Sequence, residues 1–247
     1  MTTPETTANS SLHSREHANT PPERRDHRGI TVSTAGPGVD THEMVLIHGV
    51  IRREFGQLPR LFRSAANDPA RSKLIGAHAR EMLDFLHTHH TGEDLLLFPL
   101  LRERRVLAPE LMDRMDAQHA QVNDAVVAIN AELPAWTTSA DATAGERIAA
   151  CIDMTMPTLI GHLDEEEQKL LPVVSVTLTQ SEWDALGKHG ISAIPVTRRL
   201  LTLGYITEET DDAERQKFMQ VLPAPVRLAY KLIGHRQFTR ETTAIRG

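Results

Sequence analysis

The stretch LHTHHTGEDLLLFPLL, residues 86–101, returns in outline as LIGHLDEEEQKLLPVV, residues 159–174. Each copy places a glutamate four residues after a histidine and a proline ten residues after it, and then continues into a leucine-rich run. The matched positions are His89, Glu93 and Pro99 in the first copy, and His162, Glu166 and Pro172 in the second. One pattern, His-x-x-x-Glu-x-x-x-x-x-Pro, therefore occurs twice in the chain.

The spacing of the apolar residues around both copies predicts long helices. Apolar side chains recur every three or four residues, as expected for one face of an α-helix. The predicted helices begin near residues 41, 69, 109 and 143, and a loop is expected at residues 133–141. Four long helices with short connections favour an all-α, up-down-up-down four-helix bundle.

Each His–Glu pair lies within the apolar stripe of its helix. Residues i and i+4 share one helix face, so the histidine and the glutamate of a pair point to the same side. An ionised carboxylate among leucines is costly unless a positive charge accompanies it, and the inner faces carry no lysine or arginine. The pattern therefore predicts a bound cation.

Two further histidines lie in the apolar stripes of the first and third helices. His48 and His119 are 71 residues apart, and the paired motifs are 73 residues apart. A lone inward histidine is more often a core residue than a ligand. Four helices that together converge at least four imidazoles and two carboxylates instead indicate a metal centre. Such a mixed nitrogen and oxygen set suits iron or manganese and is large enough for two ions.

Several neighbouring groups are weighed beside this set. His90 lies at the edge of the stripe and is either a ligand or a solvated flank residue. Glu167 is rotated about 100° from Glu166 and is expected to lie outside the ligand set. The remaining acidic neighbours are interpreted as a solvated face: Asp94, Asp164 and Glu165.

These residues resemble the haemerythrin-like, or HHE cation-binding, domains over roughly residues 40–173. The resemblance implies a non-haem di-iron centre, two bridging carboxylates and an open position for dioxygen. Carried over by position, the ligands would be His48, His89, Glu93, His119, His162 and Glu166, with His90 as a further candidate. The oxygen-carrying members have a second histidine one turn along the third helix, where this chain has Asn123. A fifth histidine is then reached only if His90 serves. The residues after about 176 resemble the C-terminal extension of actinobacterial members.

Composition bounds the rest of the chain. Residues 1–38 are polar and are predicted to form a disordered tail. The bundle is assigned to residues 39–175 and a helical extension to residues 176–247, where Thr179 and Glu182 suggest a capping box. A net charge of -6 predicts no nucleic-acid partner, and the single cysteine excludes thiolate clusters. Without a signal peptide or membrane-length apolar run, the protein is expected to be cytoplasmic.

Three functions compete. The first is a di-iron protein that binds or senses dioxygen, nitric oxide or iron, with manganese or zinc as alternative metals. The second is a di-iron enzyme that degrades peroxide or reduces dioxygen, although no catalytic residue is assigned. The third is a metal-stapled adaptor that acts through its C-terminal helices. Residues 223–247 are basic and amphipathic, so they are expected either to pack on the bundle or to dock a partner protein or anionic surface.

Overall fold

The computed structural model describes residues 24–25, 31–32 and 38–247. The chain falls into two units, residues 1–37 and 38–247. In the first unit, β1 (Arg24–Arg25) and β2 (Thr31–Val32) pair antiparallel. Apart from these strands and Gly38, the tail predicted for residues 1–38 lies outside the described residues.

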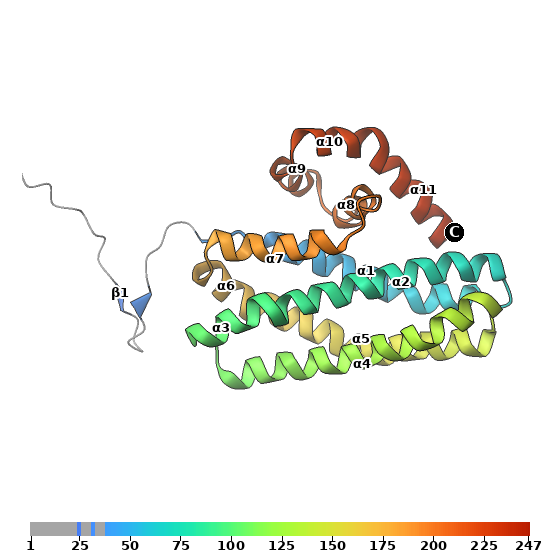
Figure 1. Ribbon diagram of the computed structural model, residues 1–247, viewed down its shortest axis with the longest axis horizontal. Helices are drawn as coiled ribbons and strands as arrows, with labels where there is room; N and C mark the ends of the chain where they lie inside the picture. The colour runs from blue at the N-terminus through green and yellow to red at the C-terminus, as the bar shows by residue number, and fades with distance from the viewer. Residues whose placement is uncertain (1–23, 26–30, 33–37) are drawn as a thin grey trace, which may run out of the picture. The chain divides into compact units, whose positions relative to one another are not determined.

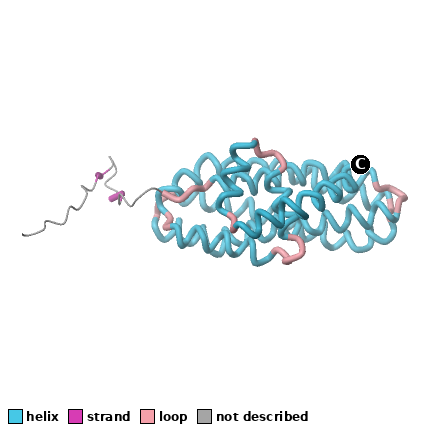
Figure 2. The backbone as a smooth tube through the Cα atoms, turned by 90° about the horizontal axis from the view of Figure 1, so that it is seen from above, coloured by secondary structure: helices cyan, strands magenta, loops and turns pink. Residues whose placement is uncertain are grey.

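The second unit is built from helices joined by short turns (Figures 1 and 2). The bundle contains α1 (His42–Ser64), α2 (Pro69–Gly92), the π-helical segment η1 (Glu93–Leu97), α3 (Phe98–Arg104), α4 (Pro109–Ser139), α5 (Ala142–Glu165), the π-helical segment η2 (Glu166–Leu170) and α6 (Leu171–Thr177). The extension contains α7 (Gln180–Ala193), α8 (Arg199–Thr207), α9 (Asp212–Val221), α10 (Ala224–Ala229), the π-helical segment η3 (Tyr230–Gly234) and α11 (His235–Arg246). The predicted all-α class is confirmed.

Local sequence signals explain several of the helix ends. Asn67 takes a left-handed φ of 61° in the turn after α1, a conformation that asparagine tolerates better than most residues. The Asp68 side chain then accepts hydrogen bonds from two backbone N–H groups at the start of α2, and Asp141 caps α5 in the same way. The capping box predicted for Thr179 and Glu182 is present at the start of α7.

The loop predicted at residues 133–141 is wrong, because α4 continues through Pro134 to Ser139. Proline removes one backbone hydrogen bond and tends to break a helix. Packing keeps this helix intact, since Trp136 is fully buried and its ring lies 4.6 Å from that of Phe62. The hydroxyl of Thr137 also donates to the Leu133 carbonyl.

The bundle core is divided along its length into two apolar clusters. Helix α1 packs against α5, and α4 packs against both α2 and α5. One cluster surrounds Phe62 and Trp136 at the end where α1 turns into α2. The other surrounds Phe98 and Met115 at the opposite end. The predicted metal residues belong to neither cluster, so they form a polar layer between the two.

The extension packs on the bundle through α7, α8 and α11. Helix α11 buries Phe238, Thr242 and Ile245. A regular helical period would put Ile233 on the same face as Val226 and Tyr230 and predicts one apolar strip there, but Ile233 is 52% exposed. The π turn η3 starts at Tyr230 and adds a residue to that turn, which shifts the apolar face of the following helix.

No helix in the described part of the chain is both long enough and apolar enough to cross a membrane.

Candidate metal centre

Two overlapping groups of buried side chains lie in the polar layer. The first is His90, Glu93, His119 and His162, and the second is His48, His89, Glu93 and Glu166. Within each group the potential ligand atoms all lie within 4.8 Å of one another. The structure therefore brings together all seven residues singled out in the sequence, and Glu93 belongs to both groups.

Both motif glutamates stand at the first residue of a π turn. The N–H of Phe98 bonds to the carbonyl of Glu93, and the N–H of Leu171 bonds to that of Glu166. These five-residue steps come immediately before Pro99 and Pro172, which have no N–H to continue an α-helical ladder. The repeated spacing from histidine to proline thus produces a π turn in each copy, and each π turn begins at the glutamate of the motif.

The first π turn also changes which leucines enter the core. An uninterrupted α-helical period from His89 predicts that Leu96 and Leu100, seven and eleven residues further on, lie inward, but both are only partly buried. Leu97 and Leu101 are 2% and 0% exposed instead. The extra residue of the π turn rotates everything after Glu93 by one position, and the regular period therefore fails here.

The glutamate oxygens lie between imidazoles that come from different helices. Oε2 of Glu93 is 3.6 Å from Nε2 of His89 and 3.5 Å from Nε2 of His119. Oε2 of Glu166 is 3.4 Å from Nε2 of His48 and 3.5 Å from Nε2 of His162. Each carboxylate therefore joins the histidine of its own motif to the lone histidine of another helix.

His90 takes part in the centre from the position next to His89. Its ring stacks on that of His119, with ring centroids 4.1 Å apart and an interplanar angle of 20°. The side chain is 6% exposed. Its burial contradicts the solvated-flank alternative, and the ligand role of His90 stays a prediction.

A second ring of polar side chains orients the imidazoles from outside, and the sequence analysis missed it. Nδ1 of His119 lies 2.7 Å from Oδ1 of Asp94, and Nδ1 of His48 lies 2.8 Å from Oε1 of Glu167. Nδ1 of His162 lies 3.2 Å from Oε1 of Gln118. With its proton held on Nδ1, each ring presents Nε2 to the centre, as metal-ligating histidines usually do.

The assignment of Asp94 and Asp164 to a purely solvated face therefore needs correction. Asp164 and Glu167 both pair with Arg52, at 2.7 and 2.6 Å. Glu165 pairs with Arg114 and Lys169 away from the centre, but its side chain is only 13% exposed, so it is not a solvated residue either. The sequence does contain a signal for these supporting contacts. In both copies of the repeat an acidic residue directly follows the motif glutamate: Asp94 after Glu93 and Glu167 after Glu166.

Many atoms at the middle of the layer have no partner among the residues that the structure describes. The buried atoms without a hydrogen bond include Nε2 of His48, His89 and His90, Oε2 of Glu93 and both carboxylate oxygens of Glu166. Unpaired buried polar atoms are rare because each one carries a desolvation cost. All of these atoms are nitrogen or oxygen donors aimed at a common centre, so the donor set fits divalent cations of the iron and manganese type.

The acid–base properties of the centre also fit a bound cation. Burial raises the pKa of Glu93 and of Glu166 well above the usual range. Burial also lowers the pKa of His89 and His90, and brings that of His162 to about 3. Without a cation the layer thus favours neutral histidines and protonated glutamates. A bound cation favours neutral histidines too, but it stabilises the carboxylate form.

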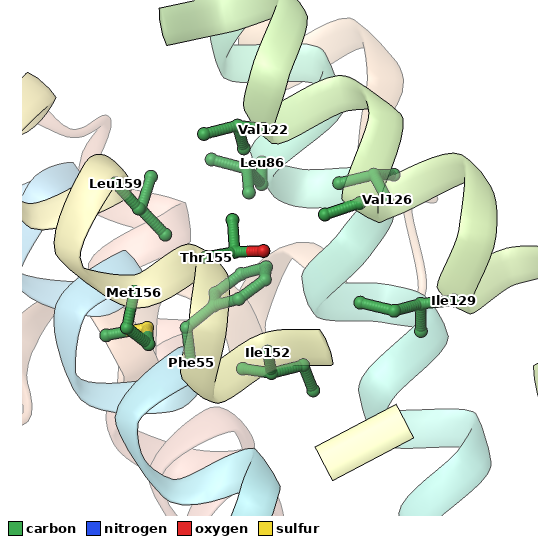
Figure 3. A pocket seen from close by; sticks show the side chains of 10 residues that line it. Phe55, Leu86, Val122, Val126, Ile129, Ile152, Thr155, Met156 and Leu159 are labelled. Atoms are coloured by element: carbon green, nitrogen blue, oxygen red, sulfur yellow. The ribbon is translucent and has the colours of Figure 1, made fainter. Parts of the chain in front are cut away.

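A small apolar cavity of about 10 Å³ lies in the bundle core beside this layer (Figure 3). Its lining includes Leu86, Val122 and Leu159, each three residues along its helix from His89, His119 or His162. Phe55 projects toward its middle in Figure 3. A cavity of this size and character is more suited to a small apolar molecule than to water, which needs polar partners.

Comparison with known proteins places this centre in a family. Residues 39–174, more than half of the chain, match the family model described as the hemerythrin HHE cation binding domain. No curated protein and no solved structure matched the chain. Because the matched segment covers both motif copies and all seven residues of the two groups, we conclude that this chain belongs to the hemerythrin HHE cation-binding family.

Proposed function

We propose that the two groups hold two non-haem iron ions and that the centre binds or senses a small diatomic molecule, either dioxygen or nitric oxide. The observation that carries the proposal is the sharing of Glu93 between two four-residue groups. Seven nitrogen and oxygen donors exceed the four of a usual zinc site, and the set contains no thiolate. The seven proposed ligands are His48, His89, His90, Glu93, His119, His162 and Glu166.

Iron in such a site supplies a reversible change of oxidation state and an open coordination position. The protein side chains perform the rest. Asp94, Gln118 and Glu167 hold the imidazole rings by Nδ1, so their Nε2 atoms stay aimed at the centre. The two apolar clusters on either side exclude water from the layer.

The apolar cavity supports a diatomic ligand over a larger one. Its volume of about 10 Å³ is near the minimum that holds one water molecule, which excludes larger ligands, and its lining is almost entirely aliphatic and aromatic. Dioxygen and nitric oxide are small and weakly polar, so this space offers them a favourable place next to the polar layer.

Metal analysis and optical spectroscopy test the proposal. We expect protein prepared without oxygen and loaded with ferrous iron to bind about two ions per chain, and its spectrum to change reversibly with dioxygen or nitric oxide. One tightly bound zinc and no iron would contradict the metal assignment. Rapid gas evolution from peroxide, with no reversible spectrum, would favour the enzymatic alternative instead.

A pair of variants on α4 tests the role of the cavity. Ala125 lines the cavity, whereas Ala128 on the same helix is exposed and lies outside it. We expect Ala125→Leu to slow or weaken diatomic binding while the iron content stays unchanged, because the added side chain fills the space. Ala128→Leu is the matched control, and equal binding by both variants would contradict a role for the cavity.

A further inference from the structure

A much larger cleft, of about 910 Å³, lies between the bundle and the C-terminal helices. Pockets for small organic molecules usually measure about 300–1,000 Å³ and are mainly apolar. We call this space the extension cleft. The apolar residues that line it include Leu74 and Phe85 on α2, Trp183 and Leu186 on α7, Leu203 on α8 and Phe218 on α9.

The extension cleft is elongated along α2. The α2 residues that line it run from Leu74 to Gly92, and six of them recur every three or four residues along one face of the helix: Leu74, His78, Glu81, Phe85, Thr88 and Gly92. Eighteen residues of α-helix rise by about 27 Å. A long, narrow apolar molecule therefore fits the cleft better than a compact one.

One end of the extension cleft reaches the metal layer. His89 and Gly92 both line it. A Cβ atom at Gly92 would lie 3.0 Å from Cδ1 of Leu186 and 3.0 Å from Cδ2 of His189. Helix α7 thus approaches α2 as closely as a glycine permits, and the cleft ends against the outer side of His89.

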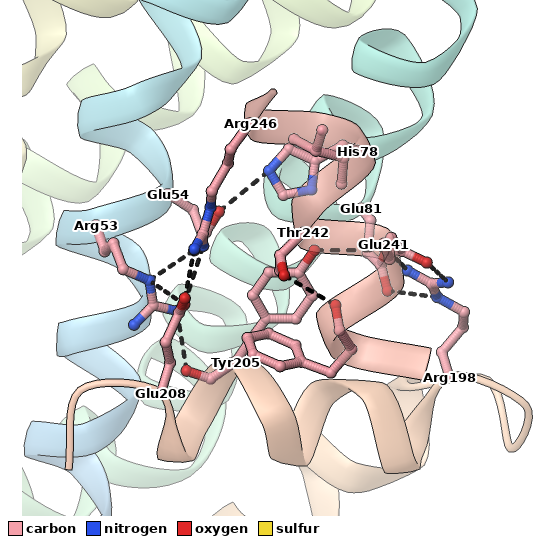
Figure 4. Close-up of polar contacts among 12 residues, drawn as sticks. Arg53, Glu54, His78, Glu81, Arg198, Tyr205, Glu208, Glu241, Thr242 and Arg246 are labelled. Carbon is pink, nitrogen blue, oxygen red and sulfur yellow. Dashed lines mark hydrogen bonds and ion pairs between the residues drawn. The ribbon is translucent and has the colours of Figure 1, made fainter. Parts of the chain in front are cut away.

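Arg198 lines the extension cleft beside Glu81, and its charge is neutralised. Arg198 donates to Glu81 through Nε at 2.9 Å and to Glu241 through Nη1 at 2.7 Å (Figure 4). One guanidinium between two carboxylates leaves no free positive charge for an anion. An ionised head group would therefore find no counter-charge at Arg198. Two other arginines also line the extension cleft, and both donate to neutral oxygens: Arg80 to Oδ1 of Asn130 and Arg199 to the Ile194 carbonyl.

His78 is the buried polar group that remains unused. It lines the extension cleft and is 3% exposed, and its Nδ1 has no hydrogen-bond partner among the described residues. Nε2 lies 3.2 Å from Oε2 of Glu54, whose other oxygen accepts from Arg53 and Arg246. A carboxylate beside Nε2 favours the proton on that nitrogen. Nδ1 is then left as an acceptor on the ring edge away from Glu54 (Figure 4).

We infer that the extension cleft binds an elongated, mainly apolar molecule with a hydroxyl head group. The hydroxyl donates a hydrogen bond to Nδ1 of His78, and the acyl-like or isoprenoid-like chain runs along α2 toward His89. This site is separate from the proposed diatomic site, since it lies outside the bundle core and needs no metal.

Fluorescence titration of the full-length protein with 1-dodecanol tests the inference. Trp183 lines the extension cleft and is one of only two tryptophans. We expect a saturable emission change at one dodecanol per chain, and its loss in Trp183→Phe. We also expect dodecanoate, whose ionised head cannot donate, to bind about tenfold more weakly. Absence of saturable binding overturns the site, and equal or tighter binding of dodecanoate overturns the head-group assignment.

Three variants locate the ligand, with binding followed by calorimetry as well as fluorescence. Ala77 on α2 and Ala193 on α7 line facing walls and are exposed, so Ala77→Phe and Ala193→Phe should each block binding. Ala128→Phe, on an exposed position of α4, is the control that should bind normally. His78→Phe keeps the ring stacked on Tyr205 but removes the acceptor, and a loss of about tenfold is expected. Full affinity in both alanine variants would overturn the location, and full affinity in His78→Phe would overturn the hydrogen bond.

Discussion

Nδ1 of His48 donates a hydrogen bond to Oε1 of Glu167 over 2.8 Å, and Nη1 of Arg52 holds the same oxygen at 2.6 Å. In the other half of the bundle, His119 and Asp94 form the equivalent contact at 2.7 Å. The acidic residue after each motif glutamate thus fixes the ring of a lone histidine on a neighbouring helix. The internal repeat therefore extends to the side chains that support the centre.

Glu167→Ala should weaken metal binding by about 10–100-fold, because the His48 ring loses the partner that fixes its proton and orientation. Helix phase alone had predicted that this substitution leaves the metal in place. Competition with a chelator of known affinity, read by metal analysis, measures the change.

Two neighbouring substitutions serve as controls for Glu167→Ala. Glu167→Gln keeps an oxygen that accepts from His48 and should retain most of the affinity. Glu165→Ala removes only the contacts to Arg114 and Lys169 on the outer face and should bind metal normally. Equal losses in Glu165→Ala and Glu167→Ala would show that general acidity, rather than the His48 contact, matters.

The number of metal ions that a variant binds should depend on whether the substituted residue belongs to one group or to both. His90 belongs to only one group and His48 only to the other, whereas Glu93 belongs to both. We expect His90→Ala and His48→Ala each to retain about one ion per chain, since the other group keeps its four donors. Glu93→Ala should lose both ions. Retention of two ions by Glu93→Ala, with folding confirmed by circular dichroism, would contradict a shared carboxylate.

Glu54→Gln should destabilise the protein by about 3 kcal/mol at pH 7, because Arg53 and Arg246 lose a buried counter-charge. Burial alone would raise the pKa of Glu54, but the neighbouring His78 and Arg53 hold that pKa below its ordinary 4.5. The stabilisation from a lowered carboxyl pKa is complete above the unfolded value and disappears as the pH falls through the folded one.

The difference in free energy of unfolding between wild type and Glu54→Gln should therefore be full at pH 7 and shrink below about pH 4.5. Urea titrations at several pH values measure it. Glu209→Gln is the control, because Glu209 also faces Arg53 but its side chain is 62% exposed, so a change within about 0.5 kcal/mol is expected. If the difference in free energy of unfolding grew as the pH fell, the predicted pH dependence would be wrong.

Removal of residues 223–247 should lower thermal stability. The truncated protein loses the burial of Phe238 and Ile245 and the ion pair between Arg246 and Glu54. Arg246→Ala should reproduce part of the effect, whereas Arg240→Ala, at an exposed position, should not. A truncated protein that keeps its stability and metal but no longer binds anionic vesicles would instead support the docking prediction for this segment.

Much of this protein follows from the sequence by itself. The 3.6-residue period of the α-helix assigns each side chain a direction, so His48, His119 and the two motifs could be placed on inner faces without a structure. The cost of burying Glu93 and Glu166 among leucines then pointed to a cation. Periodicity and burial cost are properties of single helices, which is why the bundle and the seven candidate ligands could be predicted.

Tertiary structure decided what depends on two or more helices together. The contacts from Asp94 and Glu167 to histidines on other helices require an axial register that periodicity does not encode. The π turns at Glu93 and Glu166 shift that period by one residue, which explains why Leu97 and Leu101, rather than Leu96 and Leu100, are buried. The extension cleft likewise exists only because α7 to α11 enclose it together with one face of α2, an arrangement set by packing between segments far apart in the chain.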